Sequence, residues 1–300
     1  MYAITGATGN TGKIIAKTLL ARGKQVRALG RSSDRLASLT DAGAEPFVCD
    51  ATDATALTKA FSGATAVYAM IPPNLASQDY AAYQDEVTNA ITSAIRQAGV
   101  RHVVALSSVG ADKSTGTGPV AGLHRLEEAL NQIPELNVLQ LRAAYFMENT
   151  LAQVSIIQGM GLAAGPLRAD LKLPMIATRD IGAAAAEALL NLDFSNQQTR
   201  ELLGERDISM SEAAMIMGNA IGKPDLKYLQ VPGEQVRPAL VKLGLSESVV
   251  TMILELAAAL NSGLVRPLET RSAKNTTPTS FETFVAEEFL PLYRGRSTAA

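Results

Sequence analysis

The fold of this chain is decided by one stretch near its start, Thr5-Gly6-Ala7-Thr8-Gly9-Asn10-Thr11-Gly12. The stretch follows the β-branched run Tyr2–Thr5 and opens a segment rich in Ile, Ala and Leu, so it joins a predicted strand to a predicted helix. Gly6 permits the tight turn, Gly9 lets the backbone approach a pyrophosphate, and Gly12 lets the helix pack close to the sheet. The amides at the helix start would then bind the anion. A glycine turn without a ligand is the alternative, which the combination of strand, spacing and helix disfavours.

The first half of the sequence predicts a parallel sheet. Short apolar runs alternate with longer amphipathic ones, which is typical of repeated βαβ units. The predicted strands are Tyr2–Thr5, Gln25–Leu29, Glu45–Val48, Ala66–Ala69, His102–Leu106 and Val138–Leu141. The predicted helices, each followed by a Gly, Pro or Asn stop signal, are Gly12–Arg22, Ala54–Phe61, Asp79–Gln97 and Leu123–Asn131. The fold class is therefore α/β, with a doubly wound six-stranded Rossmann sheet in residues 1–150.

Beyond Asn149 the alternation weakens, and residues 151–300 indicate a smaller, mainly helical C-terminal lobe. We expect this lobe to face the substrate and part of it to return to the Rossmann sheet. Ser209 followed by Glu212 has the spacing of a capping box, which predicts a helix that begins near Met210. The remaining predictions are a strand at Leu226–Val231, a loop at Arg266–Ser280 and a last helix at Phe281–Phe289.

Composition disfavours several classes of function. The chain has 300 residues, of which 47% are hydrophobic and 19% charged, as in an ordinary globular protein. A net charge of −2 with dispersed Lys and Arg offers no basic face for nucleic acid. The apolar stretches Ile181–Leu192 and Val249–Leu260 are too short to cross a membrane and predict core helices. The sequence enters a predicted strand at once, which favours a cytoplasmic protein. It has a single cysteine, Cys49, and no Cys/His spacing of a metal site, so we expect neither a disulfide nor a bound metal.

The residue after the second predicted strand indicates which dinucleotide binds. A carboxylate there would hydrogen-bond the 2′-hydroxyl of NAD, but the chain reads Gly30-Arg31-Ser32-Ser33, and the first acid is Asp34. The Arg31 guanidinium and the adjacent hydroxyls suit the dianionic 2′-phosphate of NADP. NADP(H) is therefore the expected cofactor. The alternative is that Arg31 and Arg35 are solvated charges at a helix start, where the helix dipole disfavours a cation.

Further cofactor contacts are expected where the next strands end. Asp50 either accepts from the adenine amino group or caps a helix, although Asp53 is better placed as the cap. Small and apolar residues at the end of the fourth strand would let the backbone pass beside the ribose. The full set of expected cofactor-binding residues is Gly6, Thr8, Gly9, Asn10, Thr11, Gly12, Arg31, Asp50, Ala51, Ala69, Met70, Ile71, Ser107, Tyr145 and Phe146.

The chain resembles the NmrA-like family of atypical short-chain dehydrogenases/reductases over nearly its whole length. The motifs that carry the resemblance are TGATGNTG at 5–12, Arg31, Val48-Cys49-Asp50, ALSSVGA at 105–111, His124 to Leu130, and LRAAYFMEN at 141–149. The resemblance implies a Rossmann domain with bound NADP(H) and a helical lobe over the nicotinamide. Side chains of the last motif would line the nicotinamide pocket, and its Asn149 equally suits a helix cap.

One departure from the wider superfamily bears on the chemistry. Mainstream members carry Tyr with Lys four residues later, and the phenol transfers a proton, whereas the corresponding stretch here has His124 and Glu128. We expect His124 to donate a proton, Ser107 or Ser108 to hydrogen-bond the acceptor or the carboxamide, and Tyr145 to form part of an aromatic floor. The corresponding alternatives are a surface histidine, a turn serine and an ordinary core tyrosine.

Two functional hypotheses follow. Some members that the chain resembles reduce quinones, triphenylmethane dyes or azo dyes with NADPH, which implies hydride transfer to a small conjugated substrate by a monomer or homodimer. Another branch binds the nucleotide without turnover, which implies an NADP(H) sensor that controls a protein partner. The amphipathic segments Glu234–Leu243 and Ser246–Leu260 suit both hypotheses, because such helices enclose a substrate or contact a partner.

Overall fold

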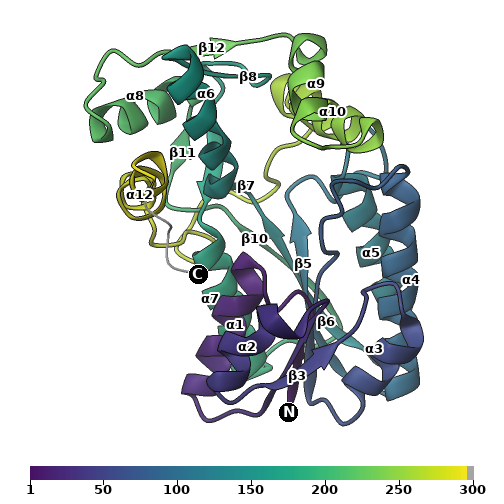
Figure 1. The fold of residues 1–300 in the computed structure, drawn as a ribbon. Helices are drawn as coiled ribbons and strands as arrows, with labels where there is room; N and C mark the ends of the chain where they lie inside the picture. Colours follow the sequence, from purple (N-terminus) through teal and green to yellow (C-terminus); the bar gives the residue numbers. More distant parts are fainter. Residues whose placement is uncertain (296–300) are drawn as a thin grey trace.

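The computed structural model describes residues 1–295 and contains the predicted parallel sheet (Figure 1). Seven strands lie in the order β10-β6-β5-β4-β1-β2-β3, and every neighbouring pair is parallel. The strands are β1 (Tyr2–Ile4), β2 (Val26–Gly30), β3 (Glu45–Val48), β4 (Ala66–Ala69), β5 (His102–Ser108), β6 (Asn137–Ala143) and β10 (Gln197–Leu202). The direction of winding reverses at β1, which pairs with both β2 and β4. Such switch points are where doubly wound sheets bind ligands, at the carboxyl ends of their strands.

Helices cover both faces of the sheet, as a doubly wound fold requires. One face carries α1 (Asn10–Ala21), α2 (Ser33–Asp41) and α7 (Thr178–Asn191), and the other carries α3 (Ala54–Phe61), α4 (Tyr80–Ala98) and α5 (Val120–Asn131) (Figure 1). Each face has its own apolar core: Ile15 and Ile181 belong to the first, and Ile91 and Leu126 to the second. The Rossmann architecture predicted from the sequence is confirmed.

The main sheet has one strand more than the six predicted. β10 has the sequence QQTREL, and its first three residues are exposed because the strand lies at the edge of the sheet. It pairs with β6 along its whole length, from Gln197 opposite Val138 to Leu202 opposite Ala143. The chain therefore returns to the main sheet after α7. An edge strand needs no continuous apolar run, so the hydrophobic pattern failed to predict it.

The second lobe stands over the carboxyl ends of the strands (Figure 1). Its helices are α6 (Gln153–Met160), α8 (Met210–Ala220), α9 (Gly233–Lys242) and α10 (Glu247–Ser262). Short strands accompany them: β7 (Tyr145–Phe146), β9 (Leu173–Ile176) and β11 (Asp207–Ile208) form one sheet, and β8 (Ala163–Gly165) pairs with β12 (Tyr228–Gln230). Only β12 lies within the predicted strand Leu226–Val231. Strands of two to four residues carry too little periodicity to be recognised.

Local signals in the sequence were accurate predictors of helix boundaries. The capping box is present, with Ser209 Oγ accepting from Glu212 N at 3.1 Å and Glu212 Oε2 accepting from Ser209 N at 2.8 Å, and α8 begins at Met210. Asp53 caps α3 by accepting from Ala56 N at 2.9 Å. The last predicted helix comprises α11 (Phe281–Phe284) and a π-helical turn at Val285–Phe289, followed by α12 (Leu290–Tyr293). Within residues 1–295, each helix is too short or too polar to span a bilayer.

Candidate cofactor and substrate site

The glycine turn between β1 and α1 has the geometry of an anion-binding loop. Gly6 has φ +59°, and a Cβ there would lie 2.3 Å from Met70 Sδ. A Cβ on Gly12 would lie 2.3 Å from the carbonyl oxygen of Gly6, so both positions require glycine. Gly9 is the exposed N-cap of α1, and no side chain in the described part of the molecule caps the first turn of that helix. The turn therefore presents backbone amides and a helix dipole to solvent, as a site for a pyrophosphate requires.

Two threonines hold this turn against β4. Thr5 Oγ1 donates to the carbonyl of Tyr68 at 3.0 Å and accepts from Met70 N at 3.0 Å. The fully buried Tyr68 hydroxyl donates to Thr11 Oγ1 at 2.9 Å. Thr11 was predicted to contact the cofactor, but its side chain points into the core, so only its backbone is available at the turn. Thr8 lies beside Gly30, since a Cβ on that glycine would be 3.4 Å from Thr8 Cγ2.

The ends of β2 and β3 bring Arg31 and Asp50 near each other. Asp50 Oδ1 accepts from the amide and the hydroxyl of Thr52 at 3.0 and 2.9 Å. The amide hydrogen bond, together with the positive charge of Arg31, holds the pKa of Asp50 below its usual value. Arg31 is exposed and forms no ion pair within residues 1–295. Its guanidinium is therefore available to an anionic ligand at the same edge of the sheet as the glycine turn.

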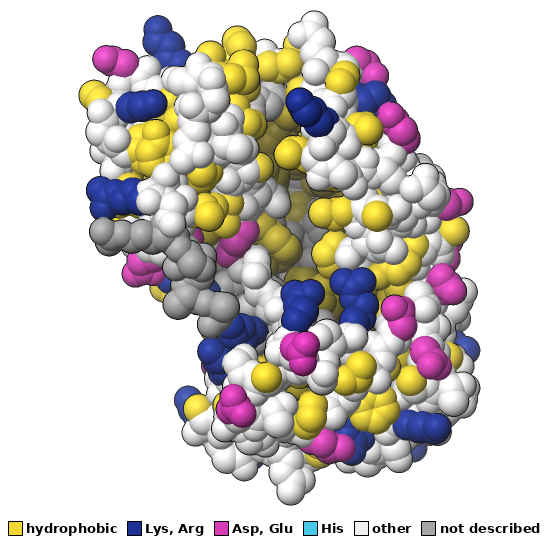
Figure 2. Space-filling model, in the orientation of Figure 1, with side chains coloured by type: hydrophobic (Ala, Val, Ile, Leu, Met, Phe, Trp, Pro, Cys, Tyr) yellow, Lys and Arg dark blue, Asp and Glu magenta, His cyan; other side chains and the backbone are white. Residues whose placement is uncertain are grey.

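A cavity of about 520 Å³ opens between the two lobes. Figure 2 shows a hollow here with hydrophobic walls and basic side chains on its lower rim. The sheet contributes Met70, Ile71, Leu106, Ser107, Ser108, Val109, Ala143 and Ala144, followed by Tyr145 and Phe146 of β7. The second lobe contributes Leu171, Lys172, Leu173, Pro174, Asp207, Leu256, Leu260, Gly263, Val265, Arg266 and Pro267. Its volume and apolar character are those of a site for a small molecule.

The structure divides the predicted cofactor-binding residues into two groups. Five of them line the cavity: Met70, Ile71, Ser107, Tyr145 and Phe146. The others lie at the glycine turn or at the ends of β2 to β4: Gly6, Thr8, Gly9, Asn10, Thr11, Gly12, Arg31, Asp50, Ala51 and Ala69. Ala69 is fully buried, so its side chain is a packing element rather than a contact surface. An extended ligand that touched both groups would run along the carboxyl edge of the sheet.

The structure qualifies the expectation that Ser107 hydrogen-bonds an acceptor. Ser107 is buried, and its Oγ donates to Glu127 Oε1 at 2.5 Å. Arg142 donates to both oxygens of the same carboxylate, from Nε at 2.9 Å and Nη2 at 2.5 Å. The hydroxyl proton of Ser107 is thus directed at Glu127, which leaves only its lone pairs for a ligand. Ser108 donates to the carbonyl of Val109 at 2.9 Å.

Glu127 was not predicted as a site residue, whereas its neighbour Glu128 was singled out for its spacing from His124. Glu128 is exposed, whereas Glu127 lies on the buried face of α5 together with Leu126 and Leu130. The signal was present in the sequence, since Leu123, Glu127 and Leu130 recur at helical spacing. An acid in such an apolar stripe is buried only when a cation pairs with it, and Arg142 is that cation.

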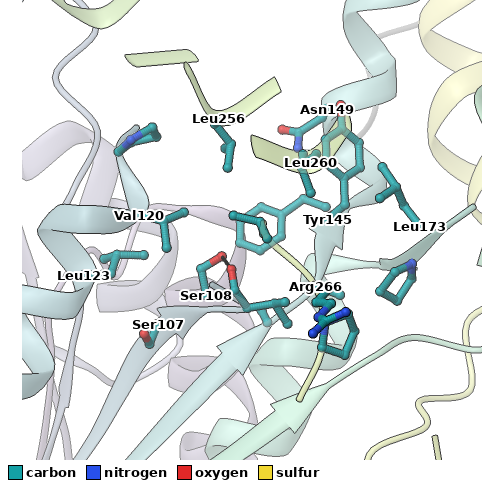
Figure 3. Close-up of a pocket in the computed structure, with 18 of the residues that line it drawn as sticks. Ser107, Ser108, Val120, Leu123, Tyr145, Asn149, Leu173, Leu256, Leu260 and Arg266 are labelled. Carbon is teal, nitrogen blue, oxygen red and sulfur yellow. Dashed lines mark hydrogen bonds between the residues drawn. The ribbon is translucent and has the colours of Figure 1, made fainter. Parts of the chain in front are cut away.

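His124 lies outside the group of residues that line the cavity. Its Nδ1 is 2.8 Å from the carbonyl oxygen of Ala111, and the ring is half-buried. Its neighbour Leu123 and, one turn earlier, Val120 do line the cavity (Figure 3). The role of His124 as proton donor is not supported by this arrangement and stays a prediction.

Tyr145 lies in the cavity wall beside Asn149 (Figure 3). Burial raises the pKa of Tyr145 to about 12, and a side-chain hydrogen bond with Asn149 opposes part of that rise. The phenol is therefore neutral at physiological pH and places a polar hydroxyl group in an otherwise apolar wall. Asn149 lies inside the short 3₁₀-helical segment Met147–Ala152 and does not cap it.

Comparison with known proteins gives one family and several similar chains. The NmrA-like family matches residues 2–290. The NAD(P)H azoreductase of Xenophilus azovorans is 27% identical over 262 residues, which cover 86% of this chain and 86% of that protein. The NADPH-dependent quinone oxidoreductase QOR2 from Escherichia coli, solved with NADPH, has a TM-score of 0.75 at 22% identity, covering 96% of this chain and 100% of that one. The negative transcriptional regulator NmrA, solved with NAD, has a TM-score of 0.66 at 18% identity, covering 98% and 96% of the two chains. The similarity to these two solved structures shows that they share the fold of this chain.

Proposed function

The chain belongs to the NmrA-like family, and from this premise we propose that it is an NADPH-dependent reductase that transfers hydride to a planar conjugated acceptor, such as a quinone, an azo dye or a triphenylmethane dye. The observation that carries the proposal is that two features lie at the same edge of the sheet, where its strands end. One is the glycine turn before the uncapped helix α1, with Arg31 nearby, and the other is the apolar cavity at the ends of β4 to β6. The azoreductase that the chain resembles supports the reaction class.

The residues present fit NADP(H). Gly9, which has no side chain, and the first turn of α1 suit the pyrophosphate, because a side chain at Gly9 would occupy the space that the phosphates need. Arg31 suits the 2′-phosphate. The cavity would then receive the nicotinamide end together with the acceptor, and Met70 and Tyr145 would contact them.

The cavity favours acceptors that need little acid catalysis. When bound, NADPH supplies a hydride, which is two electrons and one proton, and the second proton of the reduced acceptor comes from solvent. The chain's contribution is to exclude water with apolar walls and to hold a flat ring, for which Leu173, Leu256 and Leu260 are placed (Figure 3). The Tyr145 phenol is a weak acid with a pKa raised to about 12. An ordinary ketone would need a stronger acid, whereas a quinone or a cationic dye accommodates the incoming charge itself.

Steady oxidation of NADPH with a panel of quinones, azo dyes and triphenylmethane dyes tests this proposal. We expect turnover with at least one of these classes and much slower oxidation of secondary alcohols with NADP⁺. The fold shared with a transcriptional regulator makes the sensor the second candidate. Tight binding of NADPH with no turnover on any acceptor would overturn the reductase and favour the sensor.

A further inference from the structure

The charged residues at the cavity leave it with unbalanced positive charge. Those that line it are Lys172, Asp207 and Arg266. The Asp207 carboxylate accepts from Arg271, so a cation outside the lining balances it. The Lys172 ammonium is exposed and its nearest paired carboxylate oxygen, on Glu212, is 3.8 Å away. Arg266 is exposed at the rim of the cavity, and within residues 1–295 its side chain forms no ion pair and no hydrogen bond to another residue.

The backbone on both sides of Arg266 is held by hydrogen bonds, so its side chain starts from a fixed point at the rim of the cavity. Leu268 N donates to both carboxylate oxygens of Glu201 at 3.0 Å, and Glu269 N donates to Glu201 Oε2 at 2.8 Å. Glu201 is 2% exposed and lies on β10 of the main sheet. On the other side of Arg266, the buried Val265 donates from its amide to Ala259 O at 3.1 Å. The loop is thus fixed both to the main sheet and to α10.

Figure 3 shows Arg266 below Leu260 and Tyr145 at the edge of the cavity, with Leu256 and Leu173 on its other walls. A guanidinium offers a planar fork that matches the oxygens of a carboxylate or sulfonate. The combination of an apolar cavity and an arginine without a partner at its rim suits an aromatic molecule that carries an anionic group. A cation on the acceptor would meet like charge from both Arg266 and Lys172.

We propose that Arg266, assisted by Lys172, makes this site selective for planar conjugated acceptors with a sulfonate or carboxylate substituent. The proposal rests on the proposed reductase function and names its substrate class. The hydride reaction is unchanged, since the anionic group is a handle for binding and takes no part in the transfer of electrons. The effect should therefore be mainly on KM, with little change in kcat.

The test compares a naphthoquinone with its sulfonated derivative and with a cationic triphenylmethane dye, in wild type, Arg266→Gln and Arg266→Lys. For Arg266→Gln we expect kcat/KM to fall about 10-fold with the sulfonated quinone, which is the scale of one charge-assisted hydrogen bond, and to change less than about 2-fold with the neutral quinone. The cationic dye should gain. Arg266→Lys retains the charge and should retain most of the preference. Because each variant is compared with wild type on the same acceptor, the effect of the sulfonate on redox potential cancels.

Arg96→Gln is the matched control, because Arg96 is an exposed arginine in the last turn of α4. This turn lies near the start of β5, whereas the cavity lies where the strands end. It should leave the ratio of sulfonated to neutral kcat/KM unchanged. Equal losses on both quinones in Arg266→Gln would overturn the proposal and assign Arg266 to general support of the cavity.

Calorimetric titration with a non-reducible naphthalene sulfonate separates this proposal from the reductase assignment. If no acceptor is reduced, the proposed function fails, but weaker binding of the sulfonate to Arg266→Gln than to wild type would still support the anion site. Equal binding to both proteins would refute it.

Discussion

Replacing Arg31 with alanine should remove the preference for NADPH over NADH. A charge-assisted hydrogen bond contributes ~1.5 to 3 kcal/mol, and because Arg31 is exposed and screened by solvent we take the lower end. About 1.4 kcal/mol corresponds to a tenfold change in Kd, so wild type should bind NADPH at least about tenfold tighter than NADH. In Arg31→Ala the ratio should approach one. It should fall below one if the charge of nearby Asp50, no longer opposed by Arg31, repels the 2′-phosphate.

Isothermal titration with both nucleotides measures this ratio directly. Arg96→Ala provides the control for loss of one exposed arginine far from the strand ends. The NADPH preference of wild type should also shrink as salt is raised, since the Debye length falls from ~10 Å at 0.1 M to ~3 Å at 1 M. An unchanged NADPH to NADH ratio in Arg31→Ala would refute the placement of the 2′-phosphate at the end of β2.

Four further predictions follow from the site and its supports. Gly9→Val should abolish NADPH binding, because the added side chain would occupy the space of the pyrophosphate. The circular dichroism spectrum should stay close to that of wild type, since a Cβ at Gly9 meets only Gly6 O, at 3.3 Å. Retained NADPH affinity would contradict the assignment of this turn to the phosphates. His124→Ala should lower kcat less than about 10-fold because the ring contacts the Ala111 carbonyl and does not line the cavity, whereas a loss of 100-fold or more would make it the proton donor that the sequence predicted. Tyr145 has a folded-state pKa of about 12 against ~10 for a free phenol, so its contribution to stability should be complete below pH ~10 and decline as pH rises toward 12. In urea titrations the stability of wild type minus that of Tyr145→Phe should be constant below pH ~10 and should fall above it. A value of this difference that stays constant or rises between pH ~10 and ~12 would be inconsistent with the raised pKa. Arg142→Met should reduce the free energy of unfolding by ~3 to 5 kcal/mol, because it leaves the Glu127 carboxylate buried without its cation, and a loss below ~1 kcal/mol in urea would show that the pair is not essential.

Features encoded within a few neighbouring residues were predictable. The capping box of Ser209 and Glu212 and the cap at Asp53 depend on contacts three residues apart, and both are present. The glycine turn was equally accessible, because its strand, its spacing and its helix are contiguous. Such patterns depend only on neighbouring residues, so they were found in both halves of the chain: the glycine turn and the Asp53 cap in the Rossmann half, and the capping box in the second lobe.

Features that depend on contacts between distant residues were not predictable in the same way. β10 is a strand because β6 offers an edge, not because its own sequence is apolar. Arg266 lies in a stretch that the sequence predicts only as a loop, and its position follows from Glu201, which binds the two amides of Leu268 and Glu269. The predicted helix at Leu123–Asn131 is present within α5, but the buried acid on it is Glu127, which the sequence analysis did not single out.

A single-turnover experiment can follow the passage of hydride from NADPH to an acceptor in the cavity between the lobes. The protein is loaded with NADPH that carries deuterium at the transferred position of the nicotinamide and is mixed with a naphthoquinone, and the decay of NADPH is followed against the unlabelled cofactor. If the protein catalyses this transfer, the decay should be far faster than in free solution and slower with the deuterated cofactor. Firmly bound NADPH that is oxidised no faster than in free solution would contradict it.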